Sequence, residues 1–362
     1  MSDLSLFEHE SLIDFILNKG NGVKGLSQLN LKTIPNQFIQ PPQERLHPNQ
    51  IAAQESVPII DFSNWDDPKV AESICDAASK WGFFQIINHG IPLEVLENVK
   101  QAAHDFFNLP VVERRNYLKE NTPSQTVQLR TSFSPQVEKP TCFTDYSLIY
   151  YVLMYTSVDD LYNCYFMPYG PEDQVLEYIN WAKPVIRKLL EILLSGINVE
   201  KMDEVKESAL MASQIVSLLY YPVCPNPDLA SGAGPHADIS SLTFLLQDDV
   251  GGLYVRANEC DKWIHVEPVK GAFVVNIGDV LQIMSNDRYK SIEHRVLVSG
   301  SKNRVSVPIF VNPAPNASIG PLPEVLEAGE KPIYKQIVHS DYYNYFFSKA
   351  HDGKQTINYA KI

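Results

Sequence analysis

From Ser213 onward the chain is a series of short segments in which apolar residues alternate with polar ones or run together, and turn residues such as Gly251-Gly252 and Gly300-Ser301 separate them. The segments are IVSLLYY (215–221), SLTFLLQ (241–247), GLYVR (252–256), KWIHVE (262–267), AFVVNIG (272–278), SIEHRVLV (291–298) and RVSVPIFV (304–311). Many short strands without intervening helices are typical of a sandwich or barrel. We therefore predict a mainly β fold with flanking helices (α+β), whose core is a double-stranded β-helix, or jelly roll.

The pattern upstream of this region is mixed. Helical spacing of apolar residues predicts helices over 66–80, 93–107 and 172–194, with 200–212 as a continuation of the helical layer. Strands are expected at 57–62 and 82–88, an extended arm at 31–50, and a surface loop at 121–136. The last part of the chain predicts a tyrosine-rich amphipathic helix within 333–350. We expect three regions: a supporting helical and mixed region (1–210) that forms part of the substrate pocket, the jelly-roll core (211–320) and a helical tail (321–362).

Two stretches allow more than one interpretation. Residues 20–25, GNGVKG, match the dinucleotide fingerprint G-x-G-x-x-G. They follow a helix predicted over 4–18 and lack a surrounding βαβ pattern, so a turn between two elements is favoured. Residues 141–170 are dense in tyrosine. Buried aromatic side chains most often belong to a core, whereas here some of them alternatively line an apolar substrate pocket.

Composition narrows the classes of function. With 44% hydrophobic and 20% charged residues the chain has enough apolar material for a full core. A net charge of -13 argues against charge-driven binding to nucleic acid or to an anionic membrane. The five scattered cysteines are expected to be reduced thiols of a cytoplasmic protein. The acidic N-terminus does not match a signal peptide, and no apolar run is long enough for a membrane span.

The candidate chemistry begins with His236-Ala237-Asp238. Residues two apart on an extended segment point to the same face, so an imidazole and a carboxylate lie side by side. With His294 from a later strand they form the two-histidine, one-carboxylate set that binds Fe(II) and leaves positions open. A single histidine is more often structural. A second H-x-D, at His339 and Asp341, lies in a helical pattern in which residues two apart diverge, and is not expected to bind metal.

Arg304 and Ser306 are also two apart on a predicted strand. A guanidinium and a hydroxyl form a receptor for a carboxylate, and Tyr221 would add a second hydroxyl. A diacid such as 2-oxoglutarate would bind the metal at one end and Arg304 at the other. Taken alone, an arginine on a strand is more often part of a surface ion pair.

These residues occur within motifs that resemble the plant 2-oxoglutarate- and Fe(II)-dependent dioxygenases over nearly the whole chain. The motifs are VPIIDF, WGFFQIINHGIP, YYPVCPNPDL, HADISSLTFLLQD, GGLYV, NIGDVLQIMSN, YKSIEHRV and RVSVPIFVNP. Within that family the chain is most similar to the feruloyl-CoA and coumaroyl-CoA ortho-hydroxylases that start coumarin formation in phenylpropanoid metabolism. The sequence segments that support this closer resemblance are NKGNGVKGL, TSFSP, IGPLPEV, GEKPIYK and KAHDGK.

The resemblance implies roles for particular residues. His236, Asp238 and His294 would bind iron, and Arg304, Ser306 and Tyr221 would bind 2-oxoglutarate. Candidates for contact with the substrate are Phe310, Tyr146, Tyr150 and the phenylalanine of TSFSP, which is Phe133, beside Ser134. The cofactor is then Fe(II), with 2-oxoglutarate and O2 as co-substrates and ascorbate as reductant. The partner is a small molecule, with no nucleic acid or membrane, and the enzyme is expected to be a monomer.

Two departures from the family pattern leave alternatives open. Leu219 stands where relatives have asparagine before Y-Y-P, which predicts altered 2-oxoglutarate binding. FTDYSL (143–148) replaces a tryptophan-containing motif near the substrate pocket. The same oxidant acting on another phenolic, terpenoid or alkaloid by hydroxylation, desaturation or demethylation is one alternative; a catalytically silent metal- or ligand-binding jelly roll is another.

A CoA ester carries several negative charges and would favour a basic entrance, although the chain is acidic overall. We expect Lys139, Lys183, Arg187 and Lys188 to supply such an entrance locally.

Overall fold

The computed structural model describes residues 12–53, 55–118, 127–131, 142–152, 172–256, 262–326, 329–349 and 353–362. Its strands are β1 Ile59–Asp61, β2 Phe83–Ile87, β3 Val127–Thr131, β4 Asp145–Val152, β5 Ser213–Tyr221, β6 Ala233–His236, β7 Leu242–Gln247, β8 Leu253–Arg256, β9 Trp263–His265, β10 Phe273–Ile277, β11 His294–Val296, β12 Arg304–Asn312, β13 Ser318–Ile319 and β14 Ile337–Val338. The longer helices are α3 Pro68–Lys80, α4 Leu93–Asn108, α7 Glu172–Ser195, α8 Glu204–Met211 and α11 His339–Phe347. The shorter ones are η2 Asp14–Asn18, α2 Gly22–Ser27, η3 Asn36–Phe38, η4 Pro42–Glu44, η5 Pro48–Gln50, α5 Val111–Arg114, η6 Arg115–Tyr117, η7 Pro227–Leu229, α9 Asp279–Met284, α10 Pro323–Leu326 and η8 Gln355–Tyr359.

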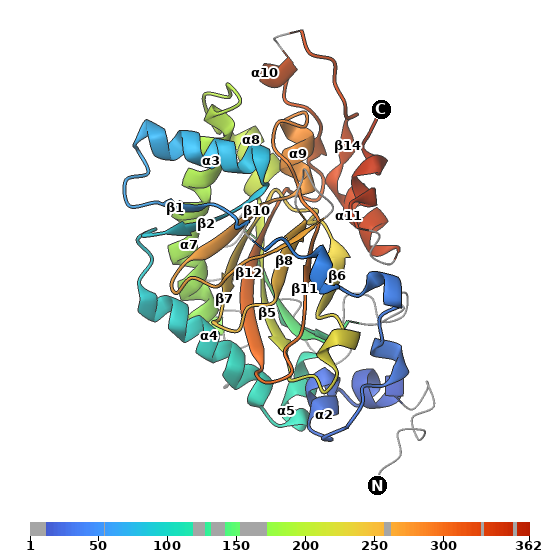
Figure 1. Cartoon of the computed structure of the whole chain (residues 1–362). Helices are drawn as coiled ribbons and strands as arrows, with labels where there is room; N and C mark the ends of the chain where they lie inside the picture. The colour runs from blue at the N-terminus through green and yellow to red at the C-terminus, as the bar shows by residue number, and fades with distance from the viewer. Residues whose placement is uncertain are drawn as a thin grey trace.

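Two facing sheets form the core (Figure 1). The larger has the strand order β1-β2-β10-β7-β12-β5-β4-β3, and the smaller has the order β6-β11-β8-β9. Apolar side chains from both sheets, including Leu245 and Tyr221 of the larger and Val255 and Val296 of the smaller, pack in one cluster between them. The predicted jelly roll with flanking helices is confirmed, and each segment predicted to be a strand between 215 and 311 contains one.

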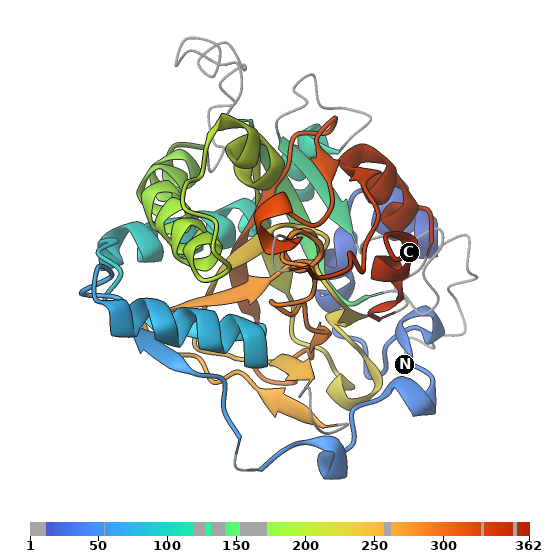
Figure 2. The ribbon, with the colours of Figure 1, turned by 90° about the horizontal axis from the view of Figure 1, so that it is seen from above.

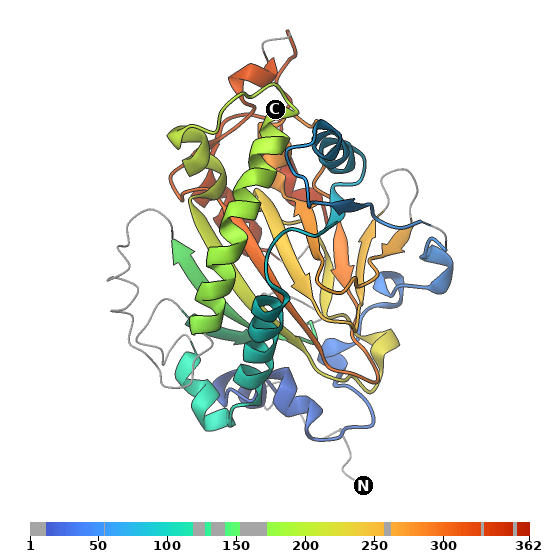
Figure 3. The same cartoon turned by 90° about the vertical axis from the view of Figure 1, so that its left-hand side faces the viewer.

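The second face of the large sheet is covered by α3, α4 and α7, which lie side by side against it (Figure 3). Seen from above, these helices lie on one side of the sheets and the C-terminal helix α11 on the other (Figure 2). Along β12, Val305, Val307 and Ile309 belong to the cluster that packs on the helices. Because side chains alternate along a strand, Arg304 and Ser306 face the space between the two sheets.

The prediction of a surface loop over 121–136 is wrong for residues 127–131. They form β3, which pairs antiparallel with β4 in the register Val127 to Ile149 and Thr131 to Asp145. The segment is polar because β3 is the edge strand of the large sheet, and polar side chains do not mark an edge strand off from a loop. In the part of the chain that the structure describes, no helix is both long and apolar enough to cross a membrane.

Residues 20 and 21 of the glycine-rich sequence form the predicted connection between two elements, η2 and α2, and residues 22–25 belong to α2 itself. Its amides bind a carboxylate of the same chain: the backbone N–H groups of Val23 and Lys24 each donate to Asp145 at 2.8 Å. Gly22 has φ +66°, and a Cβ there would clash with the carboxylate of Asp145, so the close approach requires glycine. This contact fastens the N-terminal region to β4, the strand next to β5.

Asp145 is buried, and burial raises the pKa of its carboxyl group against the opposing effect of the hydrogen bonds from Lys24, Thr131 and Val23. The hydroxyl of Thr131 donates to Oδ1 at 2.7 Å. We expect Asp145→Asn to lower the free energy of unfolding by about 2–4 kcal/mol, because charged acceptors are lost in a buried site. Urea denaturation measures this change. The matched control is Asp14→Asn, which removes an exposed carboxylate and should leave the midpoint nearly unchanged; an equal effect of both variants would contradict the prediction.

Candidate metal centre

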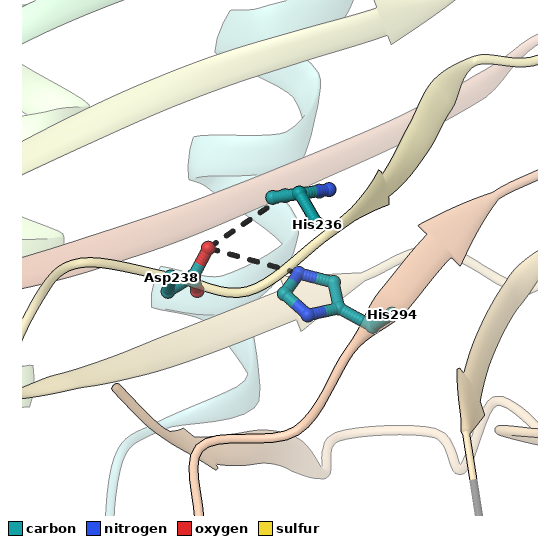
Figure 4. Close-up of side chains that lie close together, drawn as sticks. All are labelled: His236, Asp238 and His294. Atoms are coloured by element: carbon teal, nitrogen blue, oxygen red, sulfur yellow. Dashed lines mark ion pairs between the residues drawn. The ribbon is translucent and has the colours of Figure 1, made fainter. Parts of the chain in front are cut away.

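Three side chains converge between the sheets: His236 at the end of β6, Asp238 in the following loop and His294 at the start of β11 (Figure 4). Pairing of β6 with β11 places His236 directly opposite His294. Oδ1 of Asp238 lies 3.7 Å from Nε2 of each histidine. One ligand atom from each residue lies within 4.8 Å of the others, and all three residues are buried.

The Asp238 carboxylate is held so that its two oxygens differ. Oδ2 accepts hydrogen bonds from the Thr243 hydroxyl at 2.5 Å and from the Asn276 amide at 2.8 Å. Oδ1 faces the two imidazoles. Such outer hydrogen bonds orient a ligand and are typical of metal sites.

Both histidines present the same nitrogen to the centre. Nδ1 of His236 lies 2.8 Å from the carbonyl oxygen of Gly234, and Nδ1 of His294 lies 3.3 Å from that of Ile292. Since a carbonyl oxygen only accepts, this geometry assigns the proton to Nδ1 and the lone pair to Nε2. Each Nε2 is thus a donor atom for a metal.

The charge states also suit a cation. Burial lowers the pKa of His294 to about 4; the charge of His236 adds to this shift and Asp238 opposes it. Burial by itself would raise the pKa of Asp238, but the two imidazoles together with Thr243 and Asn276 lower it. At neutral pH His294 is therefore a neutral imidazole and Asp238 an ionised carboxylate, the forms in which these groups bind metal.

Among the described residues this is the one group of three or more histidine, cysteine or acidic side chains close enough to share a metal ion. His339 begins α11, as the helical pattern predicted, and its H-x-D sequence joins no such group.

Arg304, Ser306 and Tyr221 come together on neighbouring strands of the large sheet. Arg304 pairs with Tyr221 across β12 and β5, and its Cζ lies 4.9 Å from the centre of the tyrosine ring. Its Nη1 donates to the Ser306 hydroxyl at 2.9 Å, and its Nη2 donates to Oε1 of Gln247 at 3.3 Å. Arg304 is 1% exposed and, among the described residues, no carboxylate forms an ion pair with it. A buried guanidinium without an anion is a site for an anionic ligand.

Of the residues predicted to contact the substrate, the structure describes the side chain of Phe310 but not those of Tyr146, Tyr150 and Phe133. Phe310 is half-buried on β12 and lies opposite Ile215 of β5. On its other side it lies opposite Thr243 of β7, the residue whose hydroxyl donates to Asp238. Tyr146 and Tyr150 lie on β4, opposite Leu219 and Ile215 of β5. Their side chains, and the whole of Phe133, lie outside the described part of the structure.

The expected basic entrance does not form at α7. Arg187 pairs with Glu191 and Glu207, and Lys188 pairs with Asp66. Helix α7, which also carries Lys183, packs on the face of the large sheet opposite to Tyr221, so these cations lie away from the site. The positions of these cations along the chain do not determine which face of the molecule they occupy. Lys139 lies outside the described residues.

Several polar residues around the centre were not predicted from the sequence. Thr243 and Asn276 hold Asp238, Gln247 binds Arg304, and Asp279 and Lys354 form an ion pair nearby. Thr243, Gln247 and Asn276 are buried polar side chains within apolar strands. That is the one sequence signal that would have identified them.

We expect Asn276→Ala to weaken binding of a divalent metal by about ten- to a hundredfold, because Oδ2 of Asp238 loses one of its two donors. Calorimetric titration of the metal-free protein with Mn²⁺ measures the affinity. Asn344→Ala, an exposed change on α11, is the control. Equal affinity in the two variants would show that this hydrogen bond does not support the metal centre.

Comparison with known proteins agrees with this geometry. A model of the 2OG-Fe(II) oxygenase superfamily matches residues 212–313, and a model of the non-haem dioxygenase in morphine synthesis N-terminal region matches residues 57–169. A bifunctional coumaroyl-CoA and feruloyl-CoA ortho-hydroxylase of Ipomoea batatas is 54% identical over 349 residues, covering 96% of each chain. Feruloyl-CoA ortho-hydroxylase 1 of Arabidopsis thaliana is 55% identical over 350 residues, covering 96% of this chain and 95% of that protein.

Among solved structures, that of JOX2 in complex with 2OG, Fe and JA superposes with a TM-score of 0.81 at 30% identity, covering 94% of this chain and 97% of that one. Both the sequence and the fold thus match along almost the entire chain. The protein belongs to the 2OG-Fe(II) oxygenase superfamily.

Proposed function

We propose that the protein hydroxylates a hydroxycinnamoyl-CoA, feruloyl-CoA or coumaroyl-CoA, at the ring position ortho to the side chain, in the route that leads to coumarins. The observation that carries this proposal is the 54–55% identity to ortho-hydroxylases of these esters over 96% of the chain. The convergence of His236, Asp238 and His294 supports a working enzyme in preference to a silent binding protein.

As a member of its superfamily the protein is an oxidoreductase that uses Fe(II), 2-oxoglutarate and O2. His236, Asp238 and His294 would hold the iron in the site described above. When bound, iron supplies the oxygen chemistry: one oxygen atom enters 2-oxoglutarate as it is oxidised to succinate and CO2, and the other enters the substrate as a hydroxyl group. Ascorbate is the reductant that keeps the metal ferrous.

The residues of the second cluster bind and orient the co-substrate. Arg304 would form a bidentate contact with the distal carboxylate of 2-oxoglutarate, with the hydroxyls of Ser306 and Tyr221 beside it. Burial raises the pKa of Tyr221, so its hydroxyl stays protonated and can donate. Leu219, which is buried and lies opposite Ser306, adds apolar surface at this end of the site.

The apolar side chains between the sheets would limit the access of water to the reacting groups. Leu245, Val255 and Val296 line this space with apolar surface, and electrostatic contacts made there are stronger than in water. Phe310 would lie against the substrate, together with Tyr146, Tyr150 and Phe133. We further assign the protein to the cytoplasm as a monomer that acts on a small molecule.

The function is tested with Fe(II), 2-oxoglutarate and ascorbate in parallel assays with feruloyl-CoA and with a panel of uncharged phenolics. We expect the ortho-hydroxylated product from the CoA ester, and turnover on uncharged phenolics alone would instead support action on another scaffold. His294→Ala should abolish product formation because the iron loses one of three protein ligands. Product from His294→Ala at the wild-type rate would contradict the ligand assignment, and no succinate from the wild type with any phenolic would contradict the enzyme.

Arg304→Leu should raise the KM for 2-oxoglutarate by about a hundredfold, since truncating one partner of a buried charge pair costs about 2–5 kcal/mol. Initial rates at varied 2-oxoglutarate measure this change. Lys302→Gln removes an exposed cation two residues away and is the matched control. A KM equal to that of the control would mean that Arg304 does not bind the co-substrate.

A further inference from the structure

The end of the chain runs beside the metal centre. Gly353 forms a parallel backbone bridge with His236, a member of the cluster. Gly353 has φ +65°, a backbone conformation that favours glycine. Figure 1 shows the C-terminal region, with α11, next to β6. The segment 353–362 is therefore in direct contact with the strand that presents His236.

The next residue, Lys354, forms an ion pair with a buried carboxylate. Its Nζ lies 2.5 Å from Oδ1 of Asp279, whose side chain is 1% exposed. The hydroxyl of Tyr342, on α11, donates to Oδ2 of the same carboxylate at 2.7 Å. The Asp279 carboxylate thus binds a donor from α11 and a donor from the segment 353–362, and so connects these two parts of the chain.

Asp279 is also hydrogen-bonded to the loop that carries Asp238. Asp279 is the first residue of α9, and its backbone N–H donates to the carbonyl oxygen of Asp238 at 2.7 Å. The next amide, of Val280, donates to the carbonyl oxygen of Ser240 at 3.2 Å. Lys354 is therefore connected to the backbone of a metal-ligand candidate through a single residue. The charge of Lys354 contributes to the lowered pKa of His294, and the charge of Asp238 opposes the lowering of the Lys354 pKa by burial, which is consistent with the position of Lys354 beside the centre.

We propose that Lys354 is a positioning residue of the active site: its ion pair with Asp279 holds the segment 353–362 against the Asp238 loop and closes that side of the space in which the substrate is oxidised. The proposal rests on the proposed function. A closed site keeps water away from the reacting groups, so that each 2-oxoglutarate consumed would yield one hydroxylated product. Loss of the ion pair would leave the iron and 2-oxoglutarate contacts in place but would uncouple the two half-reactions.

The experiment compares Lys354→Met with Lys361→Met, an exposed lysine in the same segment. With saturating Fe(II) and 2-oxoglutarate, we expect the ratio of hydroxylated product to succinate to fall about tenfold in Lys354→Met and to stay unchanged in Lys361→Met. Lys354→Arg should restore most of the ratio because it keeps the cation. The rate at which chymotrypsin cleaves the tyrosine-rich region 339–362 should rise in Lys354→Met alone.

Lys354→Met leaves the Asp279 carboxylate buried without the cation that the structure places beside it, which can prevent folding. The double variant Asp279→Asn with Lys354→Met removes both charges and should fold, and the proposal expects it to be uncoupled as well. Wild-type ratio and protease resistance in this double variant would overturn the proposal, as would a lower Mn²⁺ affinity in Lys354→Met with an unchanged ratio. Absence of hydroxylated product from the wild type would instead reject the proposed function, while the protease comparison would still test the role of Lys354.

Discussion

The arrangement of the centre depends on the buried carboxylate of Asp238. Its two oxygens make different contacts: Thr243 and Asn276 donate to Oδ2, whereas Oδ1 faces both imidazoles. Desolvating an anion is costly unless it is hydrogen-bonded and paired, and this carboxylate obtains both from residues on four strands. Because the carboxylate needs all of these partners, its burial fixes the relative positions of β6, β7, β10 and β11.

Two other buried carboxylates fasten the ends of the chain. Asp145 accepts hydrogen bonds from the backbone N–H groups of Val23 and Lys24 and so binds the start of α2 to β4. Asp279 accepts Tyr342 and Lys354 and so binds the C-terminal region to α9. Since each acid is buried, its partners cannot be exchanged for water without a large cost. The N-terminal and C-terminal regions, which are distant in sequence from β4 and α9, are thereby held in place beside the sheets.

The alternation of side chains along β12 and β5 divides the large sheet into two chemical faces. Val305 and Val307 pack on the helices, while Arg304 and Tyr221 face the small sheet. The helical face supplies most of the apolar burial, and the inner face can therefore carry polar groups that recognise a ligand. A one-residue shift of β12 would exchange these faces and remove Arg304 from the site.

How far the sequence could predict this protein follows from the range of the interactions involved. The strand segments, the i and i+2 spacing of His236 with Asp238 and of Arg304 with Ser306, and the family motifs depend on local geometry, and they were sufficient to predict the jelly roll and the candidate ligands. Tertiary structure decided the pairing of His236 with His294, the hydrogen bonds of Thr243 and Asn276, the edge strand at 127–131, and the meeting of Lys354 with Asp279. These contacts join residues on different strands or on distant segments, and only the register of the sheets and the burial of the acids brings such residues within hydrogen-bonding distance.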